Sequence, residues 1–276
     1  MNSRRGTLTL RHSFVTGNRA LGTPPYGAQA DGGGIDSGGP VTIEDSVVSA
    51  NSAELSSTIA TNDFGPVAIA GGLHIGDFAP ATVTRSIVSG NLAAASSSGA
   101  DFVVGVAGGI DDDGSLVLSD SSVVHNQTTV NVLGSSPATA LVGGAMDIDG
   151  QATISGTRLV GNNGTANAPA GTTIAGGGAI ANFGRTTLER TIVTANSLTA
   201  NGAAGSADGG GIWNGDPGDG RKPSLSVSDS AITANSLSGS SGVMLAGGGV
   251  FTTFPATLEL TRTVLAGNRP DQCYGC

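Results

Sequence analysis

The stretch VTIEDSVVSAN at residues 41–51 decides the fold because it recurs along the whole chain. The copies are LTLRHSFVTGN (8–18), ATVTRSIVSGN (81–91), LVLSDSSVVHN (116–126), ATISGTRLVGN (152–162), TTLERTIVTAN (186–196), LSVSDSAITAN (225–235) and LELTRTVLAGN (258–268). Successive copies begin 33 to 40 residues apart. A repeat of this length indicates a solenoid in which each copy packs on its neighbours.

The aligned copies share two aliphatic columns. The first, eight residues before the closing Asn, is Leu10, Ile43, Val83, Leu118, Ile154, Leu188, Val227 and Leu260. The second, three residues before it, is Val15, Val48, Val88, Val123, Leu159, Val193, Ile232 and Leu265. The columns lie five residues apart, and side chains alternate along a strand, so one straight strand cannot bury both. We therefore expect two strands with a bend between them.

A second motif precedes every copy after the first and predicts a third strand. It reads GGGID, AGGLH, AGGID, GGAMD, GGAIA, GGGIW and GGGVF, with one apolar column at Ile35, Leu73, Ile110, Met146, Ile180, Ile212 and Val250. Its glycines suit a backbone that turns or approaches another closely. Each repeat then has three short strands and one longer, variable loop after the Asn. This pattern predicts an all-β parallel β-helix of about eight turns in one domain, residues 1–276, with 269–276 as a C-terminal tail.

The closing Asn column predicts a ladder at one corner of the coil. Asn accepts left-handed backbone geometry, and its amide can bond the same amide one turn away. The predicted ladder is Asn18, Asn51, Asn91, Asn126, Asn162, Asn196, Asn235 and Asn268. Six residues before each Asn, charges alternate along much of a second column: His12, Asp45, Arg85, Asp120, Gly156, Arg190, Asp229 and Arg262. Stacked turns would set opposite charges side by side.

Composition limits the partners. The net charge is −9 and Lys222 is the single lysine, so we expect no nucleic-acid partner. No apolar run reaches the roughly 18 residues of a membrane span, and no signal peptide is visible. Cys273 and Cys276 form a lone C-x-x-C, which predicts a local disulfide or two inert thiols.

The repeats resemble those of known β-helical proteins. The coil is similar to the right-handed parallel β-helix of the pectin-lyase-like superfamily. In addition, the motifs GGAI (177–180) and V-x-x-N (48–51 and 88–91) resemble the paired GGAI and FxxN repeats of polymorphic outer-membrane proteins. The resemblance covers nearly the whole chain. It implies an extracellular or cell-surface location and a monomeric part of a longer exported chain whose N-terminal cap is missing here. It does not fix an activity, since such coils carry lyases, hydrolases and adhesins.

Superfamily members that cleave polysaccharide carry their catalytic groups on an outward strand face. The residue after each apolar position of the third strand should point outward, which gives the column Asp36, His74, Asp111, Asp147, Ala181, Trp213 and Phe251. The first four could hold a cation such as calcium or act as acid and base. The alternative is an exposed structural column in an acidic protein. In the run Asp111-Asp112-Asp113 we expect only Asp111 to belong to the site, with Asp113 in a turn.

Two further features are candidates for binding. Trp213 and Phe251 could form an aromatic platform for sugar rings. The long insertion WNGDPGDGRKPS carries Asp216 and Asp219, which could hold a metal ion, although the sequence favours a plain Gly- and Pro-rich surface loop. Arg185 is a distant candidate for the basic residue that a lyase needs.

The sequence thus favours a non-catalytic, exported or surface-displayed structural or adhesive β-helix with a polysaccharide or cell-surface glycan as its expected ligand. The alternative is a polysaccharide lyase or glycoside hydrolase that uses Asp36, His74, Asp111 and Asp147.

Overall fold

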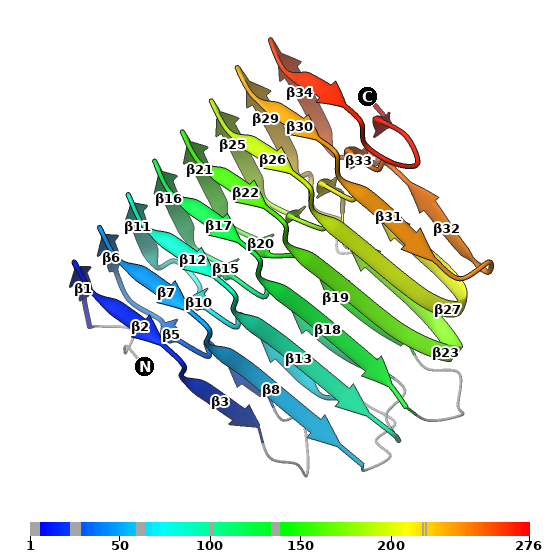
Figure 1. Ribbon diagram of the computed structural model, residues 1–276, viewed down its shortest axis with the longest axis horizontal. Helices are drawn as coiled ribbons and strands as arrows, with labels where there is room; N and C mark the ends of the chain where they lie inside the picture. Colours follow the sequence, from blue (N-terminus) through cyan, green and yellow to red (C-terminus); the bar gives the residue numbers. More distant parts are fainter. Residues whose placement is uncertain are drawn as a thin grey trace.

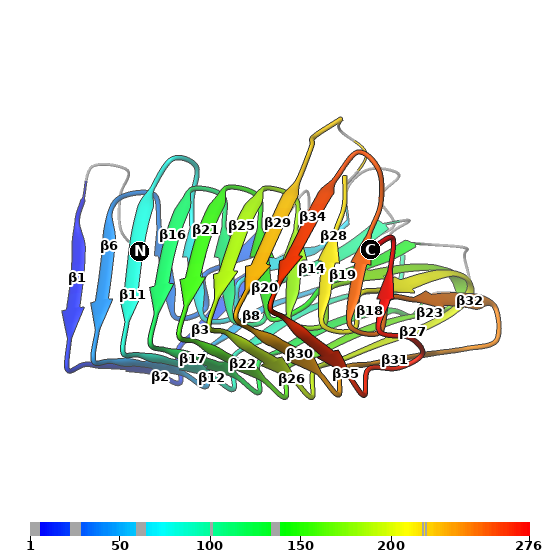
Figure 2. The same cartoon turned by 90° about the horizontal axis from the view of Figure 1, so that it is seen from above.

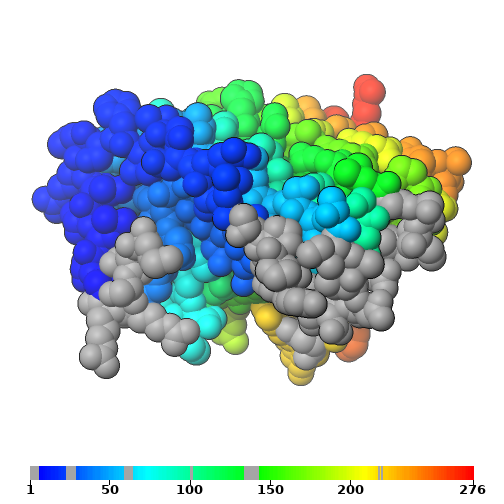
Figure 3. All heavy atoms as spheres, turned by 90° about the horizontal axis from the view of Figure 1, so that it is seen from below, coloured from blue at the N-terminus to red at the C-terminus, as the bar shows by residue number. Residues whose placement is uncertain are grey.

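The chain winds into a parallel β-solenoid of about seven turns, close to the eight expected (Figure 1). The computed structural model describes residues 6–22, 29–58, 65–99, 102–133, 139–216, 218 and 220–276, without the side chains of 139–142. This part of the chain is all β, and it holds no helix that could cross a membrane. The turns follow one another from the N-terminal to the C-terminal end of the molecule (Figure 3).

Four parallel sheets run along the solenoid. Sheet I contains β1 (Leu8–Arg11), β6 (Val41–Glu44), β11 (Pro80–Thr84), β16 (Ser115–Ser119), β21 (Gln151–Ser155), β25 (Arg185–Glu189), β29 (Ser224–Ser228) and β34 (Thr257–Thr261). Sheet II contains β2 (Phe14–Thr16), β7 (Val47–Ser49), β12 (Ile87–Ser89), β17 (Ser122–Val124), β22 (Arg158–Val160), β26 (Ile192–Thr194), β30 (Ala231–Thr233) and β35 (Val264–Ala266).

The third sheet, here the GG sheet, contains the strands that follow the glycine motif. They are β5 (Ile35–Ser37), β10 (Leu73–Ile75), β15 (Ile110–Asp112), β20 (Met146–Ile148), β24 (Ile180–Asn182), β28 (Ile212–Asn214), β33 (Val250–Thr252) and β36 (Cys273–Tyr274). These three sheets enclose the main apolar core, which contains both predicted aliphatic columns and the apolar GG column. The three strands expected in each turn are therefore present.

The fourth sheet, here the arm sheet, was not predicted. It contains β3 (Arg19–Gly22), β4 (Gln29–Asp31), β8 (Ser52–Ser57), β9 (Val67–Ile69), β13 (Leu92–Ser97), β14 (Phe102–Val106), β18 (Gln127–Val132), β19 (Thr139–Gly143), β23 (Asn163–Gly176), β27 (Ser197–Asp208), β31 (Ser236–Gly239) and β32 (Val243–Ala246). The segments expected as variable loops instead run outward and return as strands (Figure 2). Small buried side chains such as Ala93, Ala95 and Ala166 let the two layers pack closely around a second core.

The repeat columns set the register between turns. Leu10 pairs with Ile43 in sheet I, and Val15 pairs with Val48 in sheet II. The bend expected between the two strands falls at the charged column, where the backbone is left-handed. There Arg85 pairs with Asp45 and Arg262 pairs with Asp229 on neighbouring turns. These exposed ion pairs confirm the predicted stacking of opposite charges.

The eight closing Asn residues form one continuous hydrogen-bonded ladder. Seven side-chain bonds of 2.9 to 3.1 Å join each Asn to the next. Asn126 illustrates the arrangement: its Nδ2 donates to Asn162 Oδ1 and to the carbonyl of Val88, while its Oδ1 accepts from the backbone N and from Nδ2 of Asn91. Every donor and acceptor of this buried amide has a partner, as burial requires.

Each glycine pair closes the neck between the main coil and the arm. A Cβ on Gly109 would lie 3.1 Å from the Asn126 side chain, and one on Gly108 would lie 2.3 Å from the backbone oxygen of Gln127. A larger residue at Gly108 would meet backbone that cannot move aside. The motif therefore keeps small residues where the returning chain passes the ladder and the first strand of the arm; alanine takes the second position at Ala145 and Ala179.

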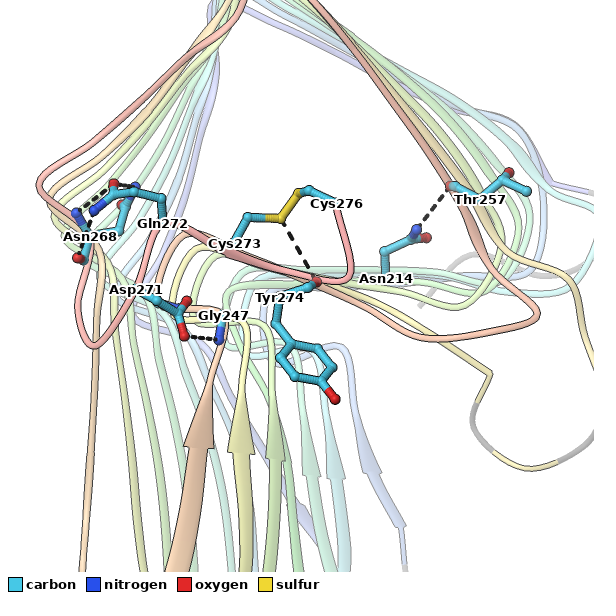
Figure 4. Close-up of a disulfide and its surroundings, with 10 residues drawn as sticks. Asn214, Gly247, Thr257, Asn268, Asp271, Gln272, Cys273, Tyr274 and Cys276 are labelled. Carbon is cyan, nitrogen blue, oxygen red and sulfur yellow. Dashed lines mark hydrogen bonds between the residues drawn. A yellow bond between two sulfur atoms is a disulfide. The ribbon is translucent and has the colours of Figure 1, made fainter.

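The C-terminal residues continue the solenoid. Gln272 accepts from Asn268 Nδ2 and so ends the Asn ladder (Figure 4). Cys273 and Cys276 form a disulfide, one of the two states expected for them. Within 269–276, β36 adds a last strand to the GG sheet beside β33.

We predict that Asn126→Ala lowers the free energy of unfolding by about 2 kcal/mol or more, because it leaves several buried groups of Asn91, Val88 and Asn162 without partners. Urea unfolding measures the change. The matched control is Gln127→Ala, an exposed neighbour whose loss should cost less than about 0.5 kcal/mol. Equal effects of the two substitutions would contradict the role given to the ladder.

Candidate functional site

The candidate site lies in the corner between the GG sheet and the returning strands of the arm. The predicted outward column stacks in register there: Asp36 with His74, His74 with Asp111, and Asp111 with Asp147. The same register continues through Ala181, Trp213, Phe251 and Tyr274. We call these eight residues the corner column. The sequence register thus placed the four catalytic candidates on neighbouring turns correctly.

The column is partly exposed at Asp36, His74, Trp213 and Phe251, but the exposure expected for its middle members was wrong. Asp111 and Asp147 are only 5 % and 4 % exposed, and Ala181 is fully buried. The arm is the reason, because its returning strands pack beside the column. A Cβ on Gly143 of β19 would lie 3.6 Å from Asp147 Oδ2, and one on Gly176 of β23 would meet the Trp213 ring.

His74 is surrounded by carboxylates. Its Nδ1 lies 3.0 Å from Asp36 Oδ1, and its Nε2 lies 3.3 Å from Asp113 Oδ2 and 3.5 Å from Asp111 Oδ2. Ligand atoms of His74, Asp111 and Asp113 all lie within 4.8 Å of one another. These three side chains are therefore close enough to bind one metal ion.

The cluster changes the proton affinity of its members. Burial lowers the pKa of His74, but the bond to Asp113, the charge of Asp111 and the bond to Asp36 outweigh it and raise the pKa to about 9. Burial raises the pKa of Asp111 well above its ordinary value, and the charge of Asp113 adds to this. Burial and the charge of Asp111 do the same to Asp147. Without a bound cation, the surrounding carboxylates therefore favour the protonated form of His74.

Two members of the cluster were missed by the sequence. Asp113 was assigned to a turn with no part in the site, yet its carboxylate reaches back one turn to His74. Asp31 comes from β4 of the arm, and burial raises its pKa, partly offset by the charge of His74. Asp112 is fully buried, in register with the core residues Ile75 and Ile148. Burial raises the pKa of Asp112 to about 7 despite a hydrogen bond from Gly114 N.

Aromatic residues occupy the C-terminal part of the corner column. Trp213 and Phe251 lie on neighbouring turns, as predicted. Trp213 packs edge-on against Phe183, with ring centres 4.9 Å apart, and Phe251 stacks on Tyr274 at 5.0 Å. Tyr274, which was not predicted, is 52 % exposed, and its ring points away from the disulfide (Figure 4). An aromatic surface thus continues the line of the acidic cluster.

The other candidates lie elsewhere. Asp216 accepts from the backbone N of Gly218 and Gly220 in the long insertion, which fits a turn, and Asp219 lies outside the described residues. Arg185 lies on sheet I, in a groove of about 490 Å³ shared with Thr187 and Ser226. It is therefore not part of the corner.

Comparison with known proteins adds no relative, since no family, curated protein or solved structure compared with this chain matches it. The class of protein defined by the coordinates is a parallel β-solenoid with an asparagine ladder.

The arm contains one carboxylate whose effect on stability can be tested by pH. Burial raises the pKa of Asp208, and a hydrogen bond from Ser206 only partly offsets this. The pKa of Asp208 is higher in the folded than in the unfolded state, where it is about 3.9. Ionisation of Asp208 therefore costs stability at a pH above its folded-state pKa, and it has no effect at a pH below the unfolded-state pKa, where the carboxyl is neutral in both states. Asp208→Asn should therefore raise the melting temperature at pH 7 and leave it nearly unchanged at pH 3. A gain of equal size at both pH values would contradict this account.

Proposed function

We propose that this protein is a non-catalytic β-solenoid of the pectin-lyase-like superfamily that binds carbohydrate at a cell surface or outside the cell. The observation that carries the proposal is the corner column, in which polar groups and stacked aromatic rings lie along one line. Extended sugar chains are recognised by apolar ring faces together with hydrogen-bonding groups spaced along them. The accessible part of the column offers the Tyr274 ring face at one end and the partly exposed polar groups of Asp36 and His74 at the other.

The cluster itself favours binding over catalysis. Asp111 and Asp147 are nearly inaccessible, so neither can readily contact a glycosidic bond. The His74 side chain is 16 % exposed, and both of its ring nitrogens face carboxylates of the protein rather than open solvent. A catalytic acid or base must instead reach the proton that it transfers.

Two features support an exported or surface location for this structural or adhesive role. The Cys273–Cys276 disulfide is of a kind that persists in oxidising compartments. The GG and V-x-x-N repeats resemble those of surface-displayed β-helical proteins. The exposed ladder of opposite charges and the acidic net charge of −9 suit a solvated rod.

Glycan binding can be measured directly because Trp213 is the only tryptophan. Titration with soluble neutral and uronic-acid oligosaccharides should change the Trp213 fluorescence. Tyr274→Ala should weaken that binding about tenfold through loss of ring stacking. Phe78→Ala is the matched control, since Phe78 is 96 % exposed in a turn that follows β10 and lies outside the column. A panel without any response, or equal effects of the two variants, would refute the proposal.

A second candidate is a glycoside hydrolase or polysaccharide lyase that uses Asp36, His74, Asp111 and Asp147. The convergence of His74 with Asp36 and Asp111 favours it, because a buried carboxyl with a raised pKa can serve as a general acid.

The two candidates differ in one assay. For a binding protein we expect no reducing ends and no unsaturated uronides from the glycan panel, with or without calcium. Cleavage by the wild-type protein that Asp111→Asn lowers by about 100-fold or more would instead establish the enzyme. If Asp111→Asn still shows the Trp213 fluorescence response to glycan, its loss of cleavage activity is chemical rather than structural.

A further inference from the structure

We propose that His74, Asp111 and Asp113 bind a divalent transition-metal ion such as Zn²⁺, with Asp36 orienting the histidine. The inference does not depend on glycan binding. It rests on the separation of the ligand atoms, on the hydrogen bond behind the histidine and on a buried carboxylate oxygen beside the cluster.

The ligand separations fit a metal ion. His74 Nε2 lies 3.3 Å from Asp113 Oδ2 and 3.5 Å from Asp111 Oδ2. Ligand atoms at about 2.1 Å from a tetrahedral zinc lie about 3.4 Å from one another, from the geometry of a tetrahedron. Nε2 therefore already has the spacing to both carboxylates that a shared ion would require.

The second nitrogen of His74 has the partner that metal-binding histidines have. Nδ1 lies 3.0 Å from Asp36 Oδ1, on the preceding turn. A carboxylate in this position keeps the proton on Nδ1 and turns the ring, and a metal ion that displaces the proton of Nε2 would then bind that nitrogen. Asp36 is thus a positioning residue, and Asp111 and Asp113 are the carboxylate ligands.

Asp147 supplies an independent observation. It is 4 % exposed, and its Oδ1 is buried with no hydrogen-bond partner among the described residues. Asp147 is the register partner of Asp111, so both side chains leave the sheet on the same side, and the charge of Asp111 acts directly on it. An orphaned buried carboxylate oxygen is costly unless a cation or a bound water satisfies it. A water molecule bound to the ion could satisfy this oxygen by donating a hydrogen bond to it.

The mixed ligand set distinguishes between metals. Calcium takes six to eight oxygen ligands, whereas imidazole favours zinc and its transition-metal neighbours. One nitrogen and two carboxylate oxygens therefore favour Zn²⁺ over the calcium considered from sequence. The disulfide leaves neither cysteine free to compete for the ion.

The test uses the full chain, treated with chelator and kept free of reductant. Isothermal titration with zinc chloride should give one equivalent of bound Zn²⁺ and a raised melting temperature, with calcium and magnesium chlorides at least tenfold weaker. His74→Ala and Asp113→Asn should each weaken zinc binding at least tenfold, and Asp36→Asn by about 10- to 100-fold. His125→Ala, which removes an exposed histidine outside the corner, should bind as the wild type does.

The controls separate loss of zinc binding from loss of folding. Circular dichroism and melting in chelator show whether His74→Ala folds, and Asp113→Asn, which keeps the side-chain shape, provides the second variant. Zinc binding that both variants retain at full affinity would overturn the proposal, as would tighter binding of calcium than of zinc. Absence of any saturable binding to the folded wild type would overturn it as well.

Discussion

The asparagine ladder is the constraint on which the rest of the structure depends. Each amide bonds the backbone and side chain of the previous turn and the side chain of the next, so a slip of one residue would break several buried hydrogen bonds at once. A small residue is also needed where the returning backbone passes the ladder, and this position is Gly109 beside Asn126 but Ala145 and Ala179 in the next two turns. The ladder and the GG sheet thus share one register.

Fixed register is also what assembles the site. Residues 38 and 37 positions apart in the chain become direct neighbours, as in Asp36 with His74 and His74 with Asp111. The arm then removes solvent from the corner, which is why burial is the largest cause of the raised pKa values of Asp111 and Asp147. The register fixed by the ladder therefore determines which side chains become neighbours in the corner column, and burial by the arm determines how strongly their charges interact.

The same division explains how much could be predicted from sequence. The repeat has fixed columns, so the solenoid, the ladder and the order of Asp36, His74, Asp111 and Asp147 could be read from it. The arm segments differ in length and are built from Ala, Gly and Ser, so no column revealed that they form strands with a core of their own. Without the arm, the burial of the cluster could not be foreseen. Asp113 lies beyond the end of its strand, where periodicity no longer predicts the direction of a side chain.

The ladder and the cluster are both buried and polar, but they differ in how they are satisfied. The ladder is neutral, and Asn126 has a partner for every donor and acceptor; even the last Asn ends on Gln272. The cluster instead brings three carboxylates around one histidine and leaves Asp147 Oδ1 without a partner among the described residues. Asp31 Oδ1 and Asp112 Oδ2 are also buried without a partner among the described residues, and an apolar residue would cost less at such positions unless a cation or a water satisfies the carboxylate. That contrast is the physical reason to regard the corner as a place for a ligand.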